Sequence, residues 1–354
     1  MFHLKNLCFL PNKKKYAAAI KSIYDKNPLG FICGLVCPDH FCMKVCTRCK
    51  IDGSVHIPAV QASLIEQYGN DFKHAFKAKT NGLKMAVIGS GPAGIGAAWK
   101  LLQLGFEVEM FEMADKAGGC LNLIPEERLP QKAFWHDYQN IFGSKHFVLH
   151  LNTPIKKPEV LLEQGYEGVI VAVGTQNINK LDIEGEEHIV SYVDYLSNSQ
   201  KYAFAKKIGI IGGGRVAADC ALTAHKQKAD SVEMIIRRSV ENLRMSDEEK
   251  EQLKIYGVKV VPLTKVLSVQ KRKDGFCCTL GATKIIEGKC VDNPDIEHKV
   301  EVFDLVIRAI GGTKIAIEEN SKIICAGDCK NGATTVVEAV ASGIKAAQSF
   351  EVAV

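Results

Sequence analysis

The sequence has no long apolar run and no strong excess of charge of either sign. Among its 354 residues, no apolar segment reaches about 18 in a row, so we expect no membrane-spanning helix. The apolar stretch Met1–Leu10 is short and interrupted by Lys5 and Asn6, which excludes a signal peptide and favours a cytoplasmic protein. A formal net charge of +5 is too small to indicate nucleic-acid binding.

The composition also argues against a disordered chain and against a disulfide framework. Apolar residues make up 47% of the sequence and charged residues 24%, as in a globular protein of two or three domains. Thirteen cysteines is an odd number, and five of them fall in the segment Cys33–Cys49. This clustering suits ligation of a metal or an iron–sulfur cluster in a reducing compartment.

The stretch Lys84–Glu112 is the element around which the chain is organised. An apolar run predicts a buried strand at Met85–Ile88, and a glycine turn, a helix over Ile95–Gln103 and a second strand follow. The turn glycines permit a tight bend, close approach of a pyrophosphate and packing of helix on strand, and the helix N-terminus can hold phosphates. Glu112 closes the second strand, where a carboxylate can bind an adenosine ribose. The predicted turn residues are Gly89, Gly91, Pro92, Ala93 and Gly94.

Further positions are candidates for contact with the same dinucleotide. Gly119 lets the backbone lie against a cofactor, and Gly174 ends a predicted strand within Tyr166–Thr175. Arg128 is available to a phosphate or a flavin edge, with a surface salt bridge as the alternative. Near the C-terminus, Gly327 and Asp328 follow a strand, and the Asp328 carboxylate can hold a ribityl hydroxyl. Thr335 and Val336 open a helix whose N–H groups can face a flavin ring.

A second strand–glycine–helix–strand unit begins at Lys206. Its turn carries Gly212 and Gly214, and Ala217 replaces the third glycine, which the motif allows. Its second strand ends at Arg237 and Arg238, where the first unit has an acid. A guanidinium binds a 2′-phosphate that a carboxylate would repel, so this unit predicts an NADPH site. A pair of solvent-facing arginines is the alternative.

The cysteine segment has the spacing C-x3-C-x4-C-x3-C-x2-C, from Cys33 through Cys37, Cys42 and Cys46 to Cys49. Thiolates this close converge on one centre if the backbone wraps around it, as it does for a [4Fe–4S] cluster. A structural zinc site and a set of buried structural thiols are the alternatives.

Taken together, these motifs resemble the FAD-dependent NAD(P)H oxidoreductases of the glutamate synthase small-subunit class. The strings NPLGFICGLVCP from residue 27 and RRSVENLR from residue 237 are closest to the N-terminal half of dihydropyrimidine dehydrogenase and to its separate bacterial subunit. The resemblance implies an α/β fold with two Rossmann-like domains behind a small helical iron–sulfur domain. The implied domains are an iron–sulfur domain (1–82), an FAD domain in two parts (83–175 and 311–354) and an inserted NAD(P)H domain (176–310).

The resemblance also assigns residues to the cofactors. It places Gly214, Arg215, Val216 and Ala217 along the nicotinamide nucleotide pyrophosphate, and Arg237, Arg238 and Arg244 around the 2′-phosphate. It gives Cys37, Cys42 and Gln61 to one iron–sulfur centre and Cys46 to another. Two clusters need eight ligands, whereas six cysteines and Gln61 are present in the first 82 residues. We therefore expect one [4Fe–4S] cluster, with candidate ligands Cys33, Cys37, Cys42, Cys46 and Gln61.

The implied function is that of an NAD(P)H-oxidising subunit that passes electrons through FAD and the cluster to a partner reductase. The chain ends at Val354 without a further domain for the substrate, so we expect a dihydropyrimidine-dehydrogenase-type partner first and a glutamate-synthase-like partner second. A stand-alone disulfide reductase would need a Cys-x-x-Cys beside the flavin, and the Cys46–Cys49 pair is far from the second glycine motif. An NADPH-binding sensor is the remaining alternative.

The cysteine pattern gives a first testable prediction. Anaerobically prepared protein should contain about four iron and four sulfide per chain and no stoichiometric zinc. Cys37→Ser and Cys42→Ser should each lose iron while keeping FAD and NADPH-to-dye activity, because the thiolates hold the cluster and not the flavin. Metal and sulfide analysis decides the matter: unchanged iron in both variants, or zinc in its place, would refute the prediction.

Overall fold

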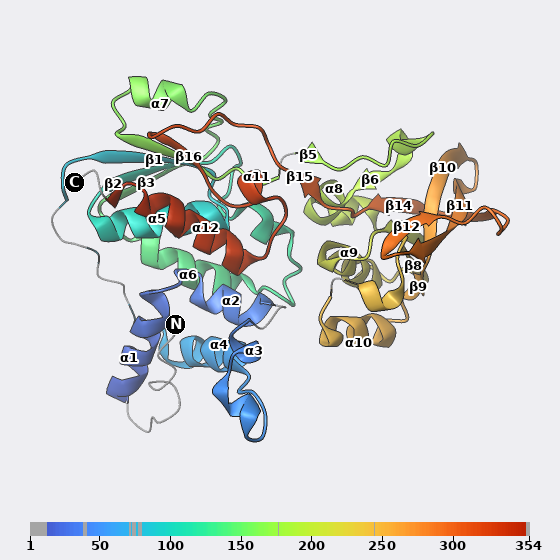
Figure 1. Ribbon diagram of the computed structural model, residues 1–354, viewed down its shortest axis with the longest axis horizontal. Helices are drawn as coiled ribbons and strands as arrows, with labels where there is room; N and C mark the ends of the chain where they lie inside the picture. The colour runs from blue at the N-terminus through green and yellow to red at the C-terminus, as the bar shows by residue number, and fades with distance from the viewer. Residues whose placement is uncertain are drawn as a thin grey trace. The chain divides into compact units, whose positions relative to one another are not determined.

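The computed structural model describes residues 13–37, 41–70, 72, 76, 80–175, 177–243 and 245–351. Among these, no helix has both the length and the apolarity needed to cross a bilayer. The chain forms two compact units, shown in Figure 1. The first comprises Met1–Asn122, Glu126–Asn177 and Thr313–Val354, as far as they are described, and the second comprises Leu123–Pro125 and Ile178–Gly312.

The first unit is built on a five-stranded parallel sheet in the order β16-β4-β1-β2-β3. Its strands are β1 (Lys84–Ile88), β2 (Glu107–Phe111), β3 (Phe147–His150), β4 (Gly168–Val171) and β16 (Ile323–Cys325). The chain runs outward from β1 to β3 and then returns to β4 on the other side of β1. The strand order therefore reverses beside β1, and the carboxyl ends of the strands there form the usual ligand-binding crevice of such sheets.

Two helices lie side by side across this sheet, as Figure 1 shows for α5 (Pro92–Leu104) and α12 (Val336–Gln348). Glycine permits their close contact: a Cβ at Gly96 would lie 2.4 Å from the Val340 carbonyl oxygen, and one at Gly343 would lie 1.9 Å from that of Ala93. The unit also contains α6 (Gln131–Phe142), α7 (Glu159–Glu163), α11 (Asp328–Asn331) and a 3₁₀ turn at Gly119–Leu123.

The N-terminal helices pack against this unit rather than forming a compact unit of their own. They are α1 (Lys13–Tyr24), α2 (Gly30–Val36), α3 (Phe41–Lys44) and α4 (Ile57–Tyr68), with a 3₁₀ turn at Thr47–Lys50. Helices α2 and α4 approach closely at Gly34, where a Cβ would lie 2.9 Å from the Ala62 side chain. The fully buried Ile23 of α1 and Ile65 of α4 both lie against Gly30 of α2.

The second unit repeats the parallel design, with the strand order β6-β14-β7-β8-β9. Its strands are β6 (Val190–Ser191), β7 (Lys207–Ile211), β8 (Ser231–Ile235), β9 (Lys259–Val261) and β14 (Leu305–Arg308). Its helices are α8 (Tyr192–Ser197), α9 (Arg215–Lys226) and α10 (Asp247–Ile255), with 3₁₀ turns at Glu186–His188, Ser199–Tyr202 and Val240–Asn242. The Rossmann-like α/β fold expected from the two glycine motifs is confirmed.

An antiparallel sheet completes the second unit. It consists of β10 (Thr264–Arg272), β11 (Gly275–Ile286), β12 (Lys289–Asp292) and β13 (Lys299–Phe303), with β11 paired to each of the other three. The short strands β5 (Asn177–Ile178) and β15 (Gly312–Thr313) pair with each other where the chain leaves the first unit and returns to it. The second unit is therefore an insertion between these two strands.

Candidate functional site

The glycine turn after β1 forms a cradle of bare backbone. Gly89 has a φ of +99°, and a Cβ there would lie 2.5 Å from the Ala172 carbonyl oxygen. A Cβ at Gly94 would lie 1.9 Å from the Gly89 carbonyl oxygen, so any side chain at 94 would push α5 away from β1. Gly91 caps α5 without a side-chain hydrogen bond, which leaves the first N–H groups of this helix for a ligand. Pro92 and Ala93 form its first turn.

Glu112 lies at the same crevice, and its carboxylate is held by the turn. The carboxylate accepts hydrogen bonds from the N–H and hydroxyl of Ser90 at 2.9 and 2.6 Å, and from the Ala114 N–H at 2.9 Å. Ser90 in turn accepts from the Gly118 N–H at its hydroxyl and from the Tyr138 hydroxyl at its carbonyl. The motif predicted Glu112, but sequence reasoning missed the fully buried Ser90 and its partner Tyr138.

The second glycine pair adds another bare surface to the cradle. Gly119 has a φ of +53°, and a Cβ there would lie 3.1 Å from the Gly91 Cα. Gly174 has a φ of +66° with open space around its Cα. Arg128 is half-buried in the same unit. Of these three residues, Gly119 is the one that lies directly against the cap of α5.

The C-terminal segment supplies the opposite side of the site. Gly327 has a φ of +75°, and a Cβ there would lie 2.5 Å from the Ala93 Cβ, so the two motifs touch. Asp328 begins α11, and its Oδ1 accepts from the Thr334 N–H and hydroxyl at 3.1 and 2.6 Å. Burial raises the pKa of Asp328. Thr335 caps α12, which begins at Val336, in a capping box with Glu338.

These features fit a flavin dinucleotide. A glycine cradle with uncapped helix N–H groups suits a pyrophosphate, and the carboxylates of Glu112 and Asp328 suit hydroxyl groups at either end of it. The residue assignments themselves stay predictions.

The second unit has a similar glycine turn, but its second strand is followed by arginines where the first unit has an acid. Gly212 has a φ of +140°, and a Cβ there would lie 2.2 Å from the Ala309 carbonyl oxygen. Gly214 caps α9 without a side-chain hydrogen bond and has open space beside it. Arg215, Val216 and Ala217 form the first turn of α9. The uncapped N-terminus fits the phosphates of a second dinucleotide.

Arg237 and Arg238 follow β8 with exposed side chains and anchored backbone. The Arg237 carbonyl accepts from the Thr283 hydroxyl at 2.8 Å and from the Cys290 thiol at 2.9 Å. The Arg238 carbonyl accepts from the Leu263 N–H. Neither guanidinium forms an ion pair with any residue that the structure describes. Arg244, predicted to join them, lies outside the described residues.

The five cysteines of the segment Cys33–Cys49 lie on, or directly beside, α2, α3 and the 3₁₀ turn at Thr47–Lys50. Cys42 lies within electrostatic reach of both Cys37 and Cys46; burial raises the pKa of Cys42, and the Val55 N–H lowers that of Cys46. Cys33 is buried on α2, and burial raises its pKa to about 12. Among the described residues, no three Cys, His, Asp or Glu side chains converge closely enough to hold a metal ion. Thiolate sulfur is the ligand type of a [4Fe–4S] cluster, so the residue types of this segment fit one, and Cys42 is electrostatically coupled to Cys37 and Cys46.

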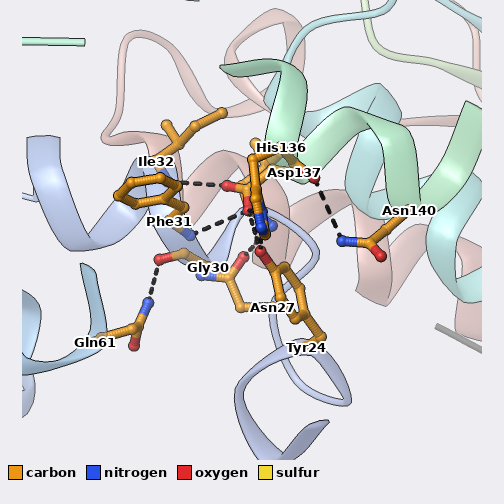
Figure 2. Close-up of polar contacts among 10 residues, drawn as sticks. Tyr24, Asn27, Gly30, Phe31, Ile32, Gln61, His136, Asp137 and Asn140 are labelled. Carbon is orange, nitrogen blue, oxygen red and sulfur yellow. Dashed lines mark hydrogen bonds and ion pairs between the residues drawn. The ribbon is translucent and has the colours of Figure 1, made fainter. Parts of the chain in front are cut away.

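A buried polar cluster joins the cysteine helix to the FAD-type fold. Figure 2 shows Asp137 of α6 reaching the first turn of α2. Its Oδ1 accepts from the Tyr24 hydroxyl at 2.6 Å and the Phe31 N–H at 3.2 Å, and its Oδ2 accepts from the Ile32 N–H at 2.8 Å. His136 Nδ1 lies 3.0 Å from the Tyr24 hydroxyl oxygen. Sequence reasoning missed Asp137, because a single acid on a helix gives no local signal.

Gln61 of α4 also contacts α2. Its amide nitrogen donates to the Gly30 carbonyl oxygen, one turn before Cys33 (Figure 2). The candidate ligand thus lies beside the cysteine helix, with its amide oxygen directed away from Gly30 in Figure 2. The structure brings Gln61 close to α2, and its role as a ligand stays a prediction.

Comparison with known proteins identifies both parts of the chain. Residues 83–343 match the family model of the pyridine nucleotide-disulphide oxidoreductases, and residues 6–74 match that of dihydropyrimidine dehydrogenase domain II, 4Fe-4S cluster. Dihydropyrimidine dehydrogenase subunit PreT homolog of Salmonella typhi, described as NAD-dependent, is 28% identical over 359 residues, which cover 95% of this chain and 85% of that protein. The glutamate synthase [NADPH] small chain of Azospirillum brasilense is 29% identical, with 92% and 78% covered.

Other matches cover a smaller share of the matched protein, or show a similarity of fold alone. Escherichia coli YgfK is 29% identical over 258 residues, which cover 70% of this chain and 25% of that protein, so the chain spans about a quarter of its length. Among solved structures, Mycobacterium tuberculosis FprA in complex with NADPH aligns with a TM-score of 0.63 at 17% identity, covering 77% of this chain and 84% of that one.

The Asp137 cluster generates a prediction about stability. In Asp137→Asn the amide nitrogen would replace Oδ2 and face the Ile32 N–H, a contact between two donors. We expect the first unit to lose about 1–3 kcal/mol of its free energy of unfolding. Both tryptophans, Trp99 and Trp135, lie in this unit, so urea titration followed by their fluorescence measures it. Gln139→Ala, an exposed change on α6, is the matched control.

Asp137→Asn should also change how the free energy of unfolding depends on pH. Burial raises the pKa of Asp137 to about 7 in the folded protein, whereas an unfolded aspartate titrates near about 4. The folded state therefore binds the Asp137 proton more tightly than the unfolded state does. The stability that this protonation contributes is lost as pH rises from about 4 to about 7. The stability difference between wild type and Asp137→Asn should be larger at pH 5 than at pH 8. An equal difference at both values would contradict the assignment.

Proposed function

Since this chain belongs to the pyridine nucleotide-disulphide oxidoreductase family, we propose that it is the electron-input subunit of a larger reductase. It is an FAD-dependent NAD(P)H oxidoreductase, related to subunit PreT of dihydropyrimidine dehydrogenase and to the glutamate synthase small chain. Its N-terminal match implies a 4Fe-4S cluster. When bound, these cofactors supply hydride acceptance and single-electron release, while the protein supplies binding, orientation and electrostatics.

The observation that carries the proposal is the attachment of the cysteine helix to the FAD-type fold through Asp137. A buried carboxylate shared among three donors from α1 and α2 fixes the position of α2 relative to α6. Such an anchor suits an electron exit, because transfer between centres requires that their separation stay fixed.

For the partner, we propose a catalytic subunit of the dihydropyrimidine dehydrogenase type. The proposal is supported by the N-terminal match and by the 95% coverage of this chain by the PreT homolog. A glutamate synthase large chain is the second candidate, favoured by 92% coverage of this chain by the small chain.

Reconstitution with each partner tests the proposal. The chain is co-expressed with a dihydropyrimidine-dehydrogenase-type catalytic subunit, and nicotinamide-coenzyme-dependent reduction of uracil is measured anaerobically. We expect a stable complex and activity that requires both subunits. Cys37→Ser should keep dye reduction and lose uracil reduction. Activity with a glutamate synthase large chain instead, or with neither partner, would reject the first candidate.

We also propose that NADPH is the preferred coenzyme, through Arg237 and Arg238. The turn residue Gly213 lies against the side chain of Ile236, so Arg237 follows directly on the residue that packs on this turn, and its side chain is exposed. A guanidinium there would bind the two negative charges of a 2′-phosphate. The acid at the equivalent place in the first unit is Glu112, which suits a ribose without that phosphate.

Steady-state kinetics of Arg237→Ala test the coenzyme assignment. Loss of one charge-assisted contact costs roughly 1.5–3 kcal/mol, so the KM for NADPH should rise about tenfold or more, while that for NADH changes little. Arg272→Ala, an exposed arginine of the same unit, serves as the matched control. Equal losses with both coenzymes, or a wild-type preference for NADH, would refute the assignment.

A further inference from the structure

One segment of the N-terminal part contains no buried residue. Residues 41–56 comprise α3, the 3₁₀ turn at Thr47–Lys50 and the chain that follows, and each is exposed or half-buried. In the view of Figure 1 this segment extends below α4. It nevertheless carries large apolar side chains, with exposed fractions of 43% at Phe41, 79% at Val45 and 84% at Ile51. The last two are the most exposed large apolar side chains in the described part of the chain.

Short contacts hold these side chains on one compact turn. The Met43 carbonyl oxygen accepts a hydrogen bond from the Cys49 thiol at 3.4 Å, which closes the loop that contains Val45. The Arg48 carbonyl oxygen accepts from the Ile51 N–H at 2.9 Å, which forms a second turn at the end of this loop. The exposed apolar side chains therefore belong to one small surface.

Cations alternate with the apolar side chains on this surface. Lys44, Arg48 and Lys50 are exposed, and the Lys44 ammonium lies 5.7 Å from the centroid of the Phe41 ring. Asp52 is the one acid in the sequence of this segment, and its carboxylate is paired with Arg48 at 2.7 Å. Neither Lys44 nor Lys50 forms an ion pair with a residue that the structure describes. The described residues thus leave two lysine charges of this surface unneutralised.

The charge distribution along the whole chain points the same way. Residues 1–82 contain 12 lysines and arginines against five aspartates and glutamates, whereas the rest of the chain contains 33 against 35. The net positive charge of the sequence therefore comes from its N-terminal part. Such an asymmetry steers encounters toward a negatively charged surface.

We propose that the surface formed by Phe41, Lys44, Val45, Lys50 and Ile51 is the docking surface for the partner subunit, at an apolar site edged by aspartate and glutamate. The inference rests on the proposed electron-input function, to which it adds the surface of contact. Clustered apolar groups left exposed mark interaction sites on proteins. The apolar contact supplies affinity, while the lysines select an acidic partner and speed the encounter.

Charge and position favour a partner subunit over a second copy of the chain. Two copies docked through this surface across a two-fold axis would bring their lysines together, and like charges would oppose the contact. A partner seated on Val45 lies one residue from Cys46, a candidate ligand of the cluster. This position shortens the path by which an electron leaves the chain, and small interfaces are typical of electron-transfer contacts.

Binding measurements with the complete, cofactor-loaded chain test the proposal. The probe is the dihydropyrimidine-dehydrogenase-type catalytic subunit, immobilised for biolayer interferometry under anaerobic conditions. Ile51→Asp puts a carboxylate among the apolar groups, and the double variant Lys44→Glu/Lys50→Glu reverses the charge beside them. We expect the Kd for the subunit to rise about tenfold or more in each. The wild-type Kd should also rise with salt concentration, because salt screens exposed charges.

Matched controls carry the same substitutions in the second unit. Ile255 is 71% exposed on α10, and Lys271 and Lys273 are exposed around the end of β10. Ile255→Asp and Lys271→Glu/Lys273→Glu should therefore leave the Kd unchanged. All four variants should keep the wild-type iron content and NADPH-to-dye activity, because none replaces a proposed cofactor ligand. Uracil reduction by the two docking-surface variants should recover as the catalytic subunit is raised to saturation.

Several outcomes would overturn the docking surface while the electron-input role stands. One is an unchanged Kd in both Ile51→Asp and Lys44→Glu/Lys50→Glu, and another is a wild-type Kd that does not respond to salt. The salt measurement uses wild-type protein, so it stands even if a variant fails to fold. Vesicles of phosphatidylcholine and phosphatidylserine that bind the wild type but not Ile51→Asp would assign the surface to a membrane instead. Self-association that Ile51→Asp abolishes would assign it to a second copy.

Failure of the proposed function would look different. In that case the wild-type chain would bind neither this catalytic subunit nor a glutamate synthase large chain. Such a result would overturn the electron-input role, and the docking surface with it.

Discussion

The first turn of α5 is held by backbone contacts that any side chain would break. Gly94 packs against the Gly89 carbonyl, Gly343 against the Ala93 carbonyl and Gly327 against the Ala93 side chain. These glycines come from the turn, from α12 and from the segment after β16. Because such contacts leave no space for a Cβ, they fix where the free N–H groups of α5 point. The position of a bound pyrophosphate, and of the two carboxylates around it, depends on this arrangement.

The local parts of the fold could be predicted from the sequence, because each rests on a short pattern. The strand and helix of the first glycine motif were expected at Met85–Ile88 and Ile95–Gln103, and the structure has β1 and α5 over or around these ranges. The strand expected within Tyr166–Thr175 is shorter, as β4 covers Gly168–Val171. Beyond Val171 the backbone turns away toward the crevice, with Gly174 in a left-handed conformation.

The long-range polar contacts could not be predicted, because no local sequence pattern connects residues that belong to separate elements. Asp137 meets Tyr24 only after α6 and α1 have packed, and the Ser90–Tyr138 contact likewise joins separate elements. The contacts of the antiparallel sheet with the Arg237 carbonyl, through Thr283 and Cys290, likewise follow from no local pattern.

The insertion of the second unit between β5 and β15 has a consequence for biosynthesis. Strand β16 and helix α12 belong to the first unit, yet they leave the ribosome after the whole of Ile178–Gly312. Until then, the edge of β4 lacks its neighbour and the glycine face of α5 lacks α12. The nascent first unit must therefore tolerate an open sheet edge and an uncovered apolar helix during synthesis, while the inserted unit, contiguous apart from Leu123–Pro125, can fold earlier. We therefore expect flavin binding to follow the synthesis of β16 and α12.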